Sequence, residues 1–161
     1  MVSDGSAYLH FWDASTLNQT RRVRVVDPAN GFQPVNDLNE LEWVHGWVFA
    51  NVWQTNRIVV IDPASGVVVS SLDGSPLSSM VHNSGRDVLN GIAYSAWEGA
   101  PGEDGAAVST MPWGGRMWLT GKKWDALFEV TLTDFNDTDT WLSAVADAAV
   151  SRPRRRRQRS E

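Results

Sequence analysis

An internal repeat constrains the fold of this chain more than any other feature of its sequence. Residues 46–62 (GWVFANVWQTNRIVVID) align without a gap with residues 115–131 (GRMWLTGKKWDALFEVT), so that the leading glycine and most apolar positions coincide. Upstream, LNELEW from Leu38 aligns with LNGIAY from Leu89. Each unit is predicted to be a strand, a turn, a second strand, a turn, and then a third and usually a fourth strand. Repeats of four antiparallel strands at about 40 to 50 residues are typical of β-propeller blades.

Short segments rich in β-branched and aromatic residues dominate the chain as far as residue 133, with no helical pattern between them. Turn signals such as DPAN, HG and DPASG separate these segments, which favours antiparallel strands. The HG signal predicts a hairpin with Gly46 at positive φ, and DPASG predicts a second turn that Gly66 closes. The predicted strands are AYLHFWD, TRRVRVV, WVFANVW, RIVVID, VVVSSLD, RMWLTG and LFEVTLT.

The number of repeat units predicts an incomplete propeller. The chain holds two units and a segment, residues 6–26, that matches only the outer hairpin of a blade. The predicted fold is therefore all-β, a partial β-propeller of about two and a half blades over residues 1–133. A propeller closes with at least four blades, because each blade buries its faces against two neighbours. We therefore expect a fragment, a shortened gene model or a protein that needs a partner, with apolar end faces that favour self-association.

The C-terminal part has a different pattern. The segment DTDTWLSAVADAAV predicts a short helix over residues 134–150, with Trp141, Leu142 and Val145 on one face. Residues 151–161 are predicted to be a disordered Arg-rich tail; the alternative is a nuclear-import or nucleic-acid-binding patch. The tail holds six Arg and one Glu, so the rest of the chain carries a net charge of about −10. Because that acidic body shows no basic face with interleaved aromatic residues, we expect no nucleic-acid partner.

Composition excludes several kinds of chemistry. The chain has no cysteine and only three well-separated histidines, so a disulfide framework, a thiol nucleophile and a metal site are not expected. No apolar run is long enough to cross a membrane, and no signal-peptide pattern follows Met1. Nine tryptophans suit both sheet packing and the walls of a ligand pocket. We expect no cofactor and no membrane partner.

Four stretches together carry a family resemblance over about residues 2–133. SDGS from Ser3, LNELEWVHGWVFANVWQTNRIVVID from Leu38, DVLNGIAY from Asp87 and MWLTGKKWDALFEV from Met117 resemble the plant-type glutaminyl-peptide cyclotransferases, or glutamine cyclotransferases. The combination of LNELE, NVWQT and TGKKW is specific. The resemblance implies a five-bladed propeller that needs no metal, and the compartment stays open because members of the family are often secretory.

The resemblance also implies a reaction. Family members convert the N-terminal glutamine of a peptide or protein into pyroglutamate and release ammonia. The α-amine attacks the γ-carboxamide carbon of the same residue, so the site must hold the glutamine bent, with amine and carbonyl close together. It must also stabilise the tetrahedral oxyanion and move a proton from the amine to the leaving ammonia.

Three binding residues follow from the resemblance. Asn39, in LNELE, resembles the asparagine that hydrogen-bonds the substrate; Trp53, in NVWQT, resembles a tryptophan of the pocket wall; Lys122, in TGKKW, resembles a lysine that bonds the carbonyl oxygen. The repeat aligns Trp53 with Lys122, so both are expected at strand ends that face the propeller channel. The family's proton-shuttling glutamate lies in a Gly-Glu-Gly-Leu motif that this sequence lacks, as it lacks a Phe-Thr-Gln-Gly motif, so no catalytic residue is assigned.

Simpler interpretations stay open for each candidate. Asn39 and Asn90 could cap strands or turns, and we interpret Asn90 as structural. Trp53 could fill the core and Lys122 could be a solvated surface lysine. Alternation along the strand predicts that Glu40 and Glu42 lie on the face opposite Asn39.

Two function classes therefore remain. The first is a glutaminyl-peptide cyclotransferase acting on N-terminal glutamine, present as an incomplete chain. The second is a non-catalytic propeller remnant that binds peptides or supports assembly.

Overall fold

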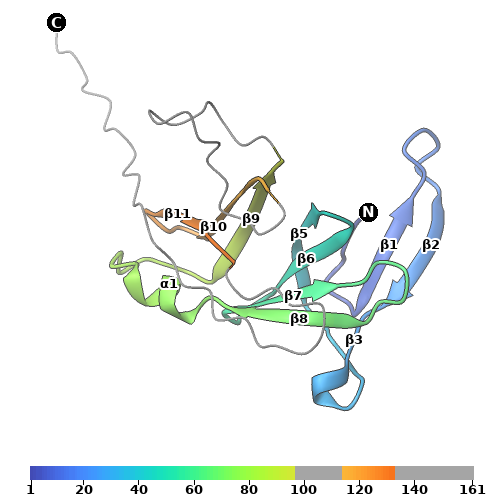
Figure 1. Cartoon of the computed structure of the whole chain (residues 1–161), viewed down its shortest axis with the longest axis horizontal. Coiled ribbons are helices and arrows are strands. Elements are labelled where there is room, and N and C mark those ends of the chain that lie inside the picture. The colour runs from blue at the N-terminus through green and yellow to red at the C-terminus, as the bar shows by residue number, and fades with distance from the viewer. Residues whose placement is uncertain (97–113, 133–161) are drawn as a thin grey trace, which may run out of the picture.

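The computed structural model describes residues 1–96 and 114–132, which form antiparallel sheets with almost no helix (Figure 1). The all-β prediction is confirmed. The strands are β1 (Tyr8–Trp12), β2 (Gln19–Arg24), β3 (Val26–Asp27), β4 (Gln33–Pro34), β5 (Leu38–Val44), β6 (Trp47–Val52), β7 (Arg57–Ile61), β8 (Val68–Asp73), β9 (Leu89–Ser95), β10 (Arg116–Gly121) and β11 (Leu127–Val130).

The strands form four sheets. β1–β2 and β3–β4 are two-stranded, β5–β6–β7–β8 is four-stranded, and β9–β10–β11 has three strands within the described residues. In Figure 1 the four-stranded sheet lies between the β1–β2 hairpin and the sheet of β9 to β11. None of the described sheets closes on itself, so five-bladed closure stays a prediction.

The internal repeat is confirmed by the register of its strands. β6 pairs with β7 through Val48 and Ile61, and β10 pairs with β11 through Met117 and Val130. These are the positions that the ungapped alignment superimposes. The two units therefore share strand order and register as well as sequence pattern, because the same alternation of apolar residues specifies the register in each.

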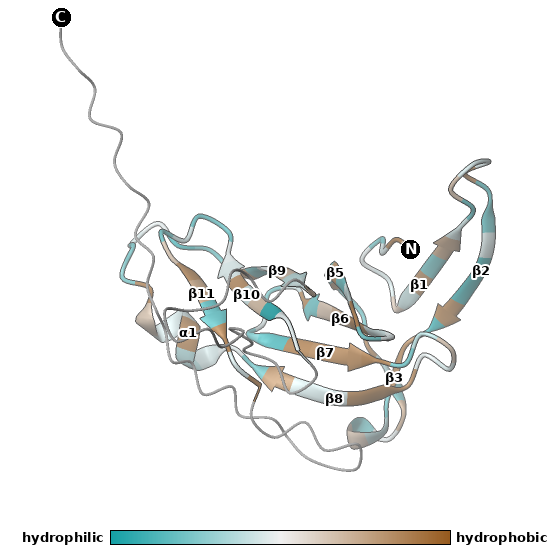
Figure 2. Cartoon of the chain, turned by 45° about the horizontal axis from the view of Figure 1, so that its top comes forward, coloured by the Kyte–Doolittle hydropathy of each residue, from teal (hydrophilic) through white to brown (hydrophobic). Residues whose placement is uncertain are grey.

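The four-stranded sheet buries both of its faces, which explains the continuous apolar run RIVVI of β7. One face packs on β9, β10, β11 and the residues that follow β8, through Phe49, Ile58, Val60, Leu89, Met117 and Phe128. The other face packs on β1 and on the residues that flank β3 and β4, through Leu9, Val25, Val35, Val48, Val59 and Ile61. Figure 2 shows β7 as apolar along most of its length, whereas β2 is largely hydrophilic.

Both predicted turns are confirmed. Gly46 has φ of +88° in the β5–β6 hairpin, and His45 before it also has positive φ, at 47°, as the two central positions of a type I′ turn require. Gly66, with φ of +79°, closes the second turn by donating its N–H to the Asp62 carbonyl at 2.7 Å. A Cβ at Gly66 would lie 2.1 Å from the Arg24 carbonyl oxygen, so only glycine lets this turn pack on β2.

The expectation of no helix between the strands was wrong at one place. A short helix, α1 (Ser75–Met80), follows β8, with proline in its first turn and Leu77 buried in the core. Its six residues give too little periodicity to be read from sequence, and its only strong signal is Ser-Pro at the N-terminus.

The first hairpin carries an arginine over an aromatic ring on each of its two faces. The Arg21 guanidinium lies 4.1 Å from the ring centre of Phe11, and that of Arg22 lies 4.8 Å from the ring centre of Tyr8. The two pairs lie on opposite faces of the hairpin, since Phe11 pairs with Arg21 whereas Tyr8 and Arg22 point to the other side, and Leu9 on the face of Phe11 packs into the core. The absence of a nucleic-acid partner stays a prediction.

The outer face of the β9–β11 sheet is also mixed. Arg116 lies 5.0 Å from the ring of Trp118 and forms two hydrogen bonds of 2.6 Å with Glu129, which lowers the pKa of that carboxyl group. Leu127 is exposed beside them. Self-association through the end faces stays a prediction.

The predicted helix over residues 134–150 and the predicted tail over residues 151–161 lie outside the described residues. Within the described parts, no helix has the length and apolar character needed to cross a membrane.

Candidate functional site

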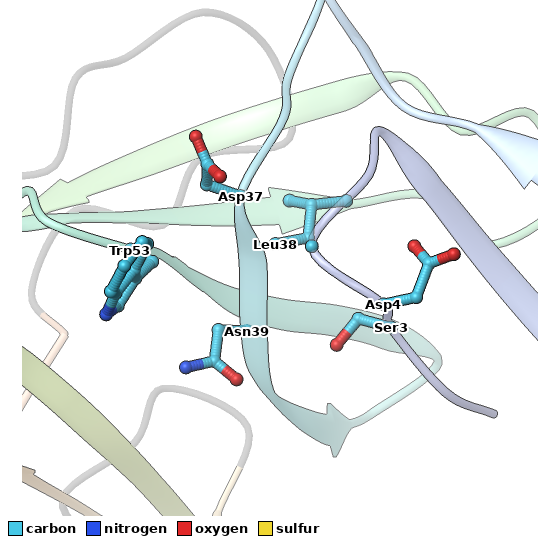
Figure 3. Close-up of a pocket in the computed structure, with 7 residues that line it drawn as sticks. Ser3, Asp4, Asp37, Leu38, Asn39 and Trp53 are labelled. Atoms are coloured by element: carbon cyan, nitrogen blue, oxygen red, sulfur yellow. The ribbon is translucent and has the colours of Figure 1, made fainter.

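A pocket of about 220 Å³ lies where β5 begins and β6 ends. β5 and β6 are antiparallel neighbours, so Asn39 near the start of one strand and Trp53 just after the other come together. The Trp53 N–H donates to the Asp37 carbonyl at 2.9 Å and fixes this end of the ladder. The lining residues are Ser3, Asp4, Gly5, Asp37, Leu38, Asn39 and Trp53 (Figure 3).

Two of the three predicted binding residues therefore share one pocket. Trp53 is 45% exposed, so it is a wall of the pocket and not a core filler. Its indole offers a flat apolar surface beside the polar amide of Asn39, which is half-buried. This combination suits a ligand with an aliphatic stem and a hydrogen-bonding end.

Lys122 does not line this pocket. It follows β10, as Trp53 follows β6, but it is 58% exposed and its Nζ lies 3.5 Å from Asp87 Oδ2. The Val88 backbone N–H, and more weakly the Lys122 ammonium, lower the pKa of Asp87. An ion pair this exposed is loose, so Lys122 can turn away from Asp87.

The SDGS segment forms the side of the pocket opposite Trp53. The sequence analysis did not assign any residue of this segment to the site. Ser3 and Asp4 both line it. Hydrogen bonds from the Ser6 hydroxyl and backbone N–H lower the pKa of Asp4, and His10 Nε2 lies 3.3 Å from its Oδ2. This carboxylate is therefore ionised at neutral pH and a weak base. The signal was present, because SDGS was one of the stretches that carried the family resemblance.

The predicted orientation of Glu42 was wrong because β5 contains a β-bulge. Asn39 pairs with Asn51 and Glu42 pairs with Phe49, so an extra residue lies on β5 between them, where Glu40 has φ of 48°. The bulge reverses the alternation and puts Glu42 on the same face as Asn39. There its Oε1 accepts the Tyr94 N–H at 3.0 Å, which ties β5 to β9 and keeps Glu42 out of the pocket.

A cluster of asparagines lies beside the pocket, at the contact between β5, β6 and β9. Asn39 Nδ2 donates to Asn90 Oδ1 at 2.6 Å, which joins the two asparagines that the repeat aligns. Asn51 is fully buried, and its Oδ1 accepts the Gly91 N–H at 3.3 Å. Sequence reasoning singled out Asn39 and Asn90 but missed Asn51, whose only signal is a polar residue inside an apolar strand.

No three His, Asp or Glu side chains lie close enough to hold a metal ion within residues 1–96 and 114–132. The metal-independent chemistry that the resemblance implied stays a prediction.

The described residues thus form an all-β repeat chain with a polar and aromatic pocket at its strand ends. The sequence model of the glutamine cyclotransferase family matches residues 1–132, and the chain belongs to that family. No curated protein matches the chain.

Among solved structures, the chain is similar to the crystal structure of glutaminyl cyclase from Myxococcus xanthus. The identity is 34% and the TM-score is 0.60, over 79% of this chain and 48% of that one. The chain thus spans about half the length of that protein.

Proposed function

We propose that this chain forms part of a glutaminyl-peptide cyclotransferase of the plant type, built on a five-bladed β-propeller. The observation that carries the proposal is the pocket in which Asn39 and Trp53 meet at adjacent strand ends, in a chain of the glutamine cyclotransferase family. The substrate is a peptide or protein with an N-terminal glutamine, and the products are its pyroglutamyl form and ammonia.

Each proposed binding residue has a physical role in this reaction. Trp53 packs against the aliphatic stem of the glutamine and restricts it to bent conformations, which brings the α-amine near the γ-carbon. Asn39 hydrogen-bonds the substrate's polar groups. Lys122, released from Asp87, donates to the carbonyl oxygen as negative charge develops on it.

A second candidate function is a peptide-binding module without catalysis. It is consistent with Asp4, one of the two carboxylates that line the described pocket, because hydrogen bonds from Ser6 lower the pKa of this group. A group that shuttles a proton from an amine needs a pKa nearer the working pH. Both candidates share the binding step, so binding is the property to test first.

We expect Trp53→Ala to weaken binding of a glutamine-starting peptide at least tenfold, because the substitution removes the apolar wall of the pocket. Isothermal titration of the 161-residue chain with such a peptide measures the effect. Trp43→Ala is the matched control, since Trp43 is 54% exposed on the same strand pair but does not line the pocket. Equal affinities of the two variants would contradict the proposed site.

We expect Lys122→Ala to weaken the same binding about threefold to tenfold, because a charged donor to the glutamine carbonyl is lost. Lys123→Ala should leave the affinity unchanged, and both variants should fold, since both side chains are exposed. The same titration compares them. If Lys122→Ala and Lys123→Ala have equally small effects, Lys122 is a surface lysine and not part of the site.

A further inference from the structure

The asparagine of the proposed site is hydrogen-bonded to a second asparagine. Asn39, on β5, donates from Nδ2 to Oδ1 of Asn90, on β9, at 2.6 Å. The two residues occupy the same position in their repeat units, and both are half-buried. This contact therefore links the pocket to the neighbouring sheet through a side chain that is not among the pocket's lining residues.

We infer that Asn90 is a positioning residue of the proposed glutamine site, which orients the Asn39 amide so that its Oδ1 is presented to the carboxamide N–H₂ of the substrate. The inference rests on the proposed function, in which Asn39 contacts the glutamine. An asparagine amide has a donor end and an acceptor end, and rotation about its last bond exchanges them. The bond from one N–H of Asn39 to Asn90 fixes this rotation, and so holds the acceptor end on the side of the amide away from Asn90.

The geometry of the pocket agrees with this orientation. In Figure 3 the amide nitrogen and oxygen of Asn39 diverge, and the oxygen lies on the side of Ser3, which lines the pocket. The nitrogen is engaged by β9. The substrate thus meets a hydrogen-bond acceptor.

Asn51 holds Asn90 in place. Its Oδ1 accepts the N–H of Gly91, the residue after Asn90, and Asn51 is itself fully buried between the sheets. A backbone N–H can only donate, so this bond fixes the orientation of the Asn51 amide. The β9 backbone is also closely packed here, because a Cβ at Gly91 would lie 2.6 Å from Thr120 Cγ2.

The orientation has a consequence for selectivity. Glutamine offers a carboxamide N–H₂ to the Asn39 oxygen, whereas glutamate offers only carboxylate oxygens, which would face another acceptor. A site that hydrogen-bonds a substrate N–H strongly rejects an analogue that lacks it. Without Asn90 the amide can rotate and present its N–H₂, and this preference for glutamine should fall.

The contact can be tested without any peptide, by thermal unfolding of Asn39→Ala, Asn90→Ala and the double variant. If the two side chains act through their shared hydrogen bond, the double variant should melt no lower than the more damaging single variant. Asn90→Asp keeps the acceptor oxygen and should melt within about 2 °C of the wild type. Additive losses of melting temperature in the double variant would overturn the inference. An Asn90→Asp variant that melts like Asn90→Ala would also overturn it, because that result means that Asn90 is the donor.

The selectivity is measured by titrating each variant with two peptides that differ only in an N-terminal glutamine or glutamate. We expect the wild type and Asn90→Asp to prefer glutamine at least tenfold, and Asn90→Ala to lose most of that preference. Asn83→Ala is the control, since the Asn83 amide donates to the Lys123 carbonyl and lies outside the pocket. An unchanged preference in Asn90→Ala overturns the inference. If the wild type binds neither peptide, the proposed function fails, and the unfolding experiment still decides whether Asn90 orients Asn39.

Discussion

The 161-residue chain should bind a glutamine-starting peptide but release no ammonia from it above the rate in buffer. Cyclisation requires a group that takes a proton from the α-amine and passes it to the leaving nitrogen, and such a group contributes roughly a hundredfold to ten-thousandfold in rate. Asp4, a carboxylate of the described pocket, has a lowered pKa because of Ser6 and is too weak a base for this step. The Gly-Glu-Gly-Leu motif that the family resemblance associates with proton transfer does not occur in the sequence.

An ammonia-release assay at neutral pH measures this directly. The glutaminyl cyclase of Myxococcus xanthus serves as the positive control with the same peptide. Turnover well above buffer that disappears in Trp53→Ala would show that the chain is catalytic by itself, with a base that lies elsewhere in its residues. Absent turnover together with peptide binding that Trp53→Ala weakens is the expected pair of results.

Removal of the Arg57 side chain should produce a large loss of stability. Asp27 is only 4% exposed, and its Oδ2 lies 2.5 Å from Arg57 Nη2 while its Oδ1 caps the short 3₁₀ turn (Pro28–Asn30) through Ala29 N. Arg57 also bonds the Ser71 hydroxyl, and so ties β3 to β7 and β8. Arg57→Ala leaves a buried carboxylate without its counter-charge, which should cost roughly 3 kcal/mol because the Arg side chain is itself partly exposed. We expect a fall in Tm of about 10 °C.

Thermal unfolding followed by circular dichroism checks the effect. Arg24→Ala is the matched control, because Arg24 is an exposed arginine on β2 and should change Tm by no more than about 2 °C. Adding Asp27→Asn to Arg57→Ala should restore part of the loss, since asparagine keeps the cap to Ala29 but carries no charge. If the second substitution restores nothing, the packing of Arg57 matters and its charge does not.

Strand positions, the two glycine turns and the shared register of the repeat units could all be predicted from the chain alone. Each depends on local rules: alternation of apolar residues, a glycine where φ is positive, and the recurrence of one pattern in two places. Gly46 and Gly66 were assigned correctly for this reason, and so was the equivalence of Val48 with Met117. The helix α1 escaped prediction because its six residues are held by packing of Leu77 against the core and not by a periodic pattern.

Two of the seven residues that line the pocket could also be singled out from the sequence, although not by local rules. Asn39 and Trp53 were identified through a family resemblance, and the pairing of β5 with β6 brings them to one pocket. The orientation of Glu42 could not be predicted, because a single bulge at Glu40 reverses the faces of the strand and leaves no clear mark in the sequence.

The sequence by itself therefore determined the all-β class, the repeat, the turns and the residues that define the family. Only the tertiary structure decided which side chains meet: Asn39 with Asn90, Asp27 with Arg57, and Glu42 with the backbone of Tyr94. The physical reason is the distance along the chain over which each kind of interaction acts. Alternation and turn chemistry act between neighbours along the chain, whereas these three contacts join residues that are 30 to 52 positions apart and exist only once the sheets have packed.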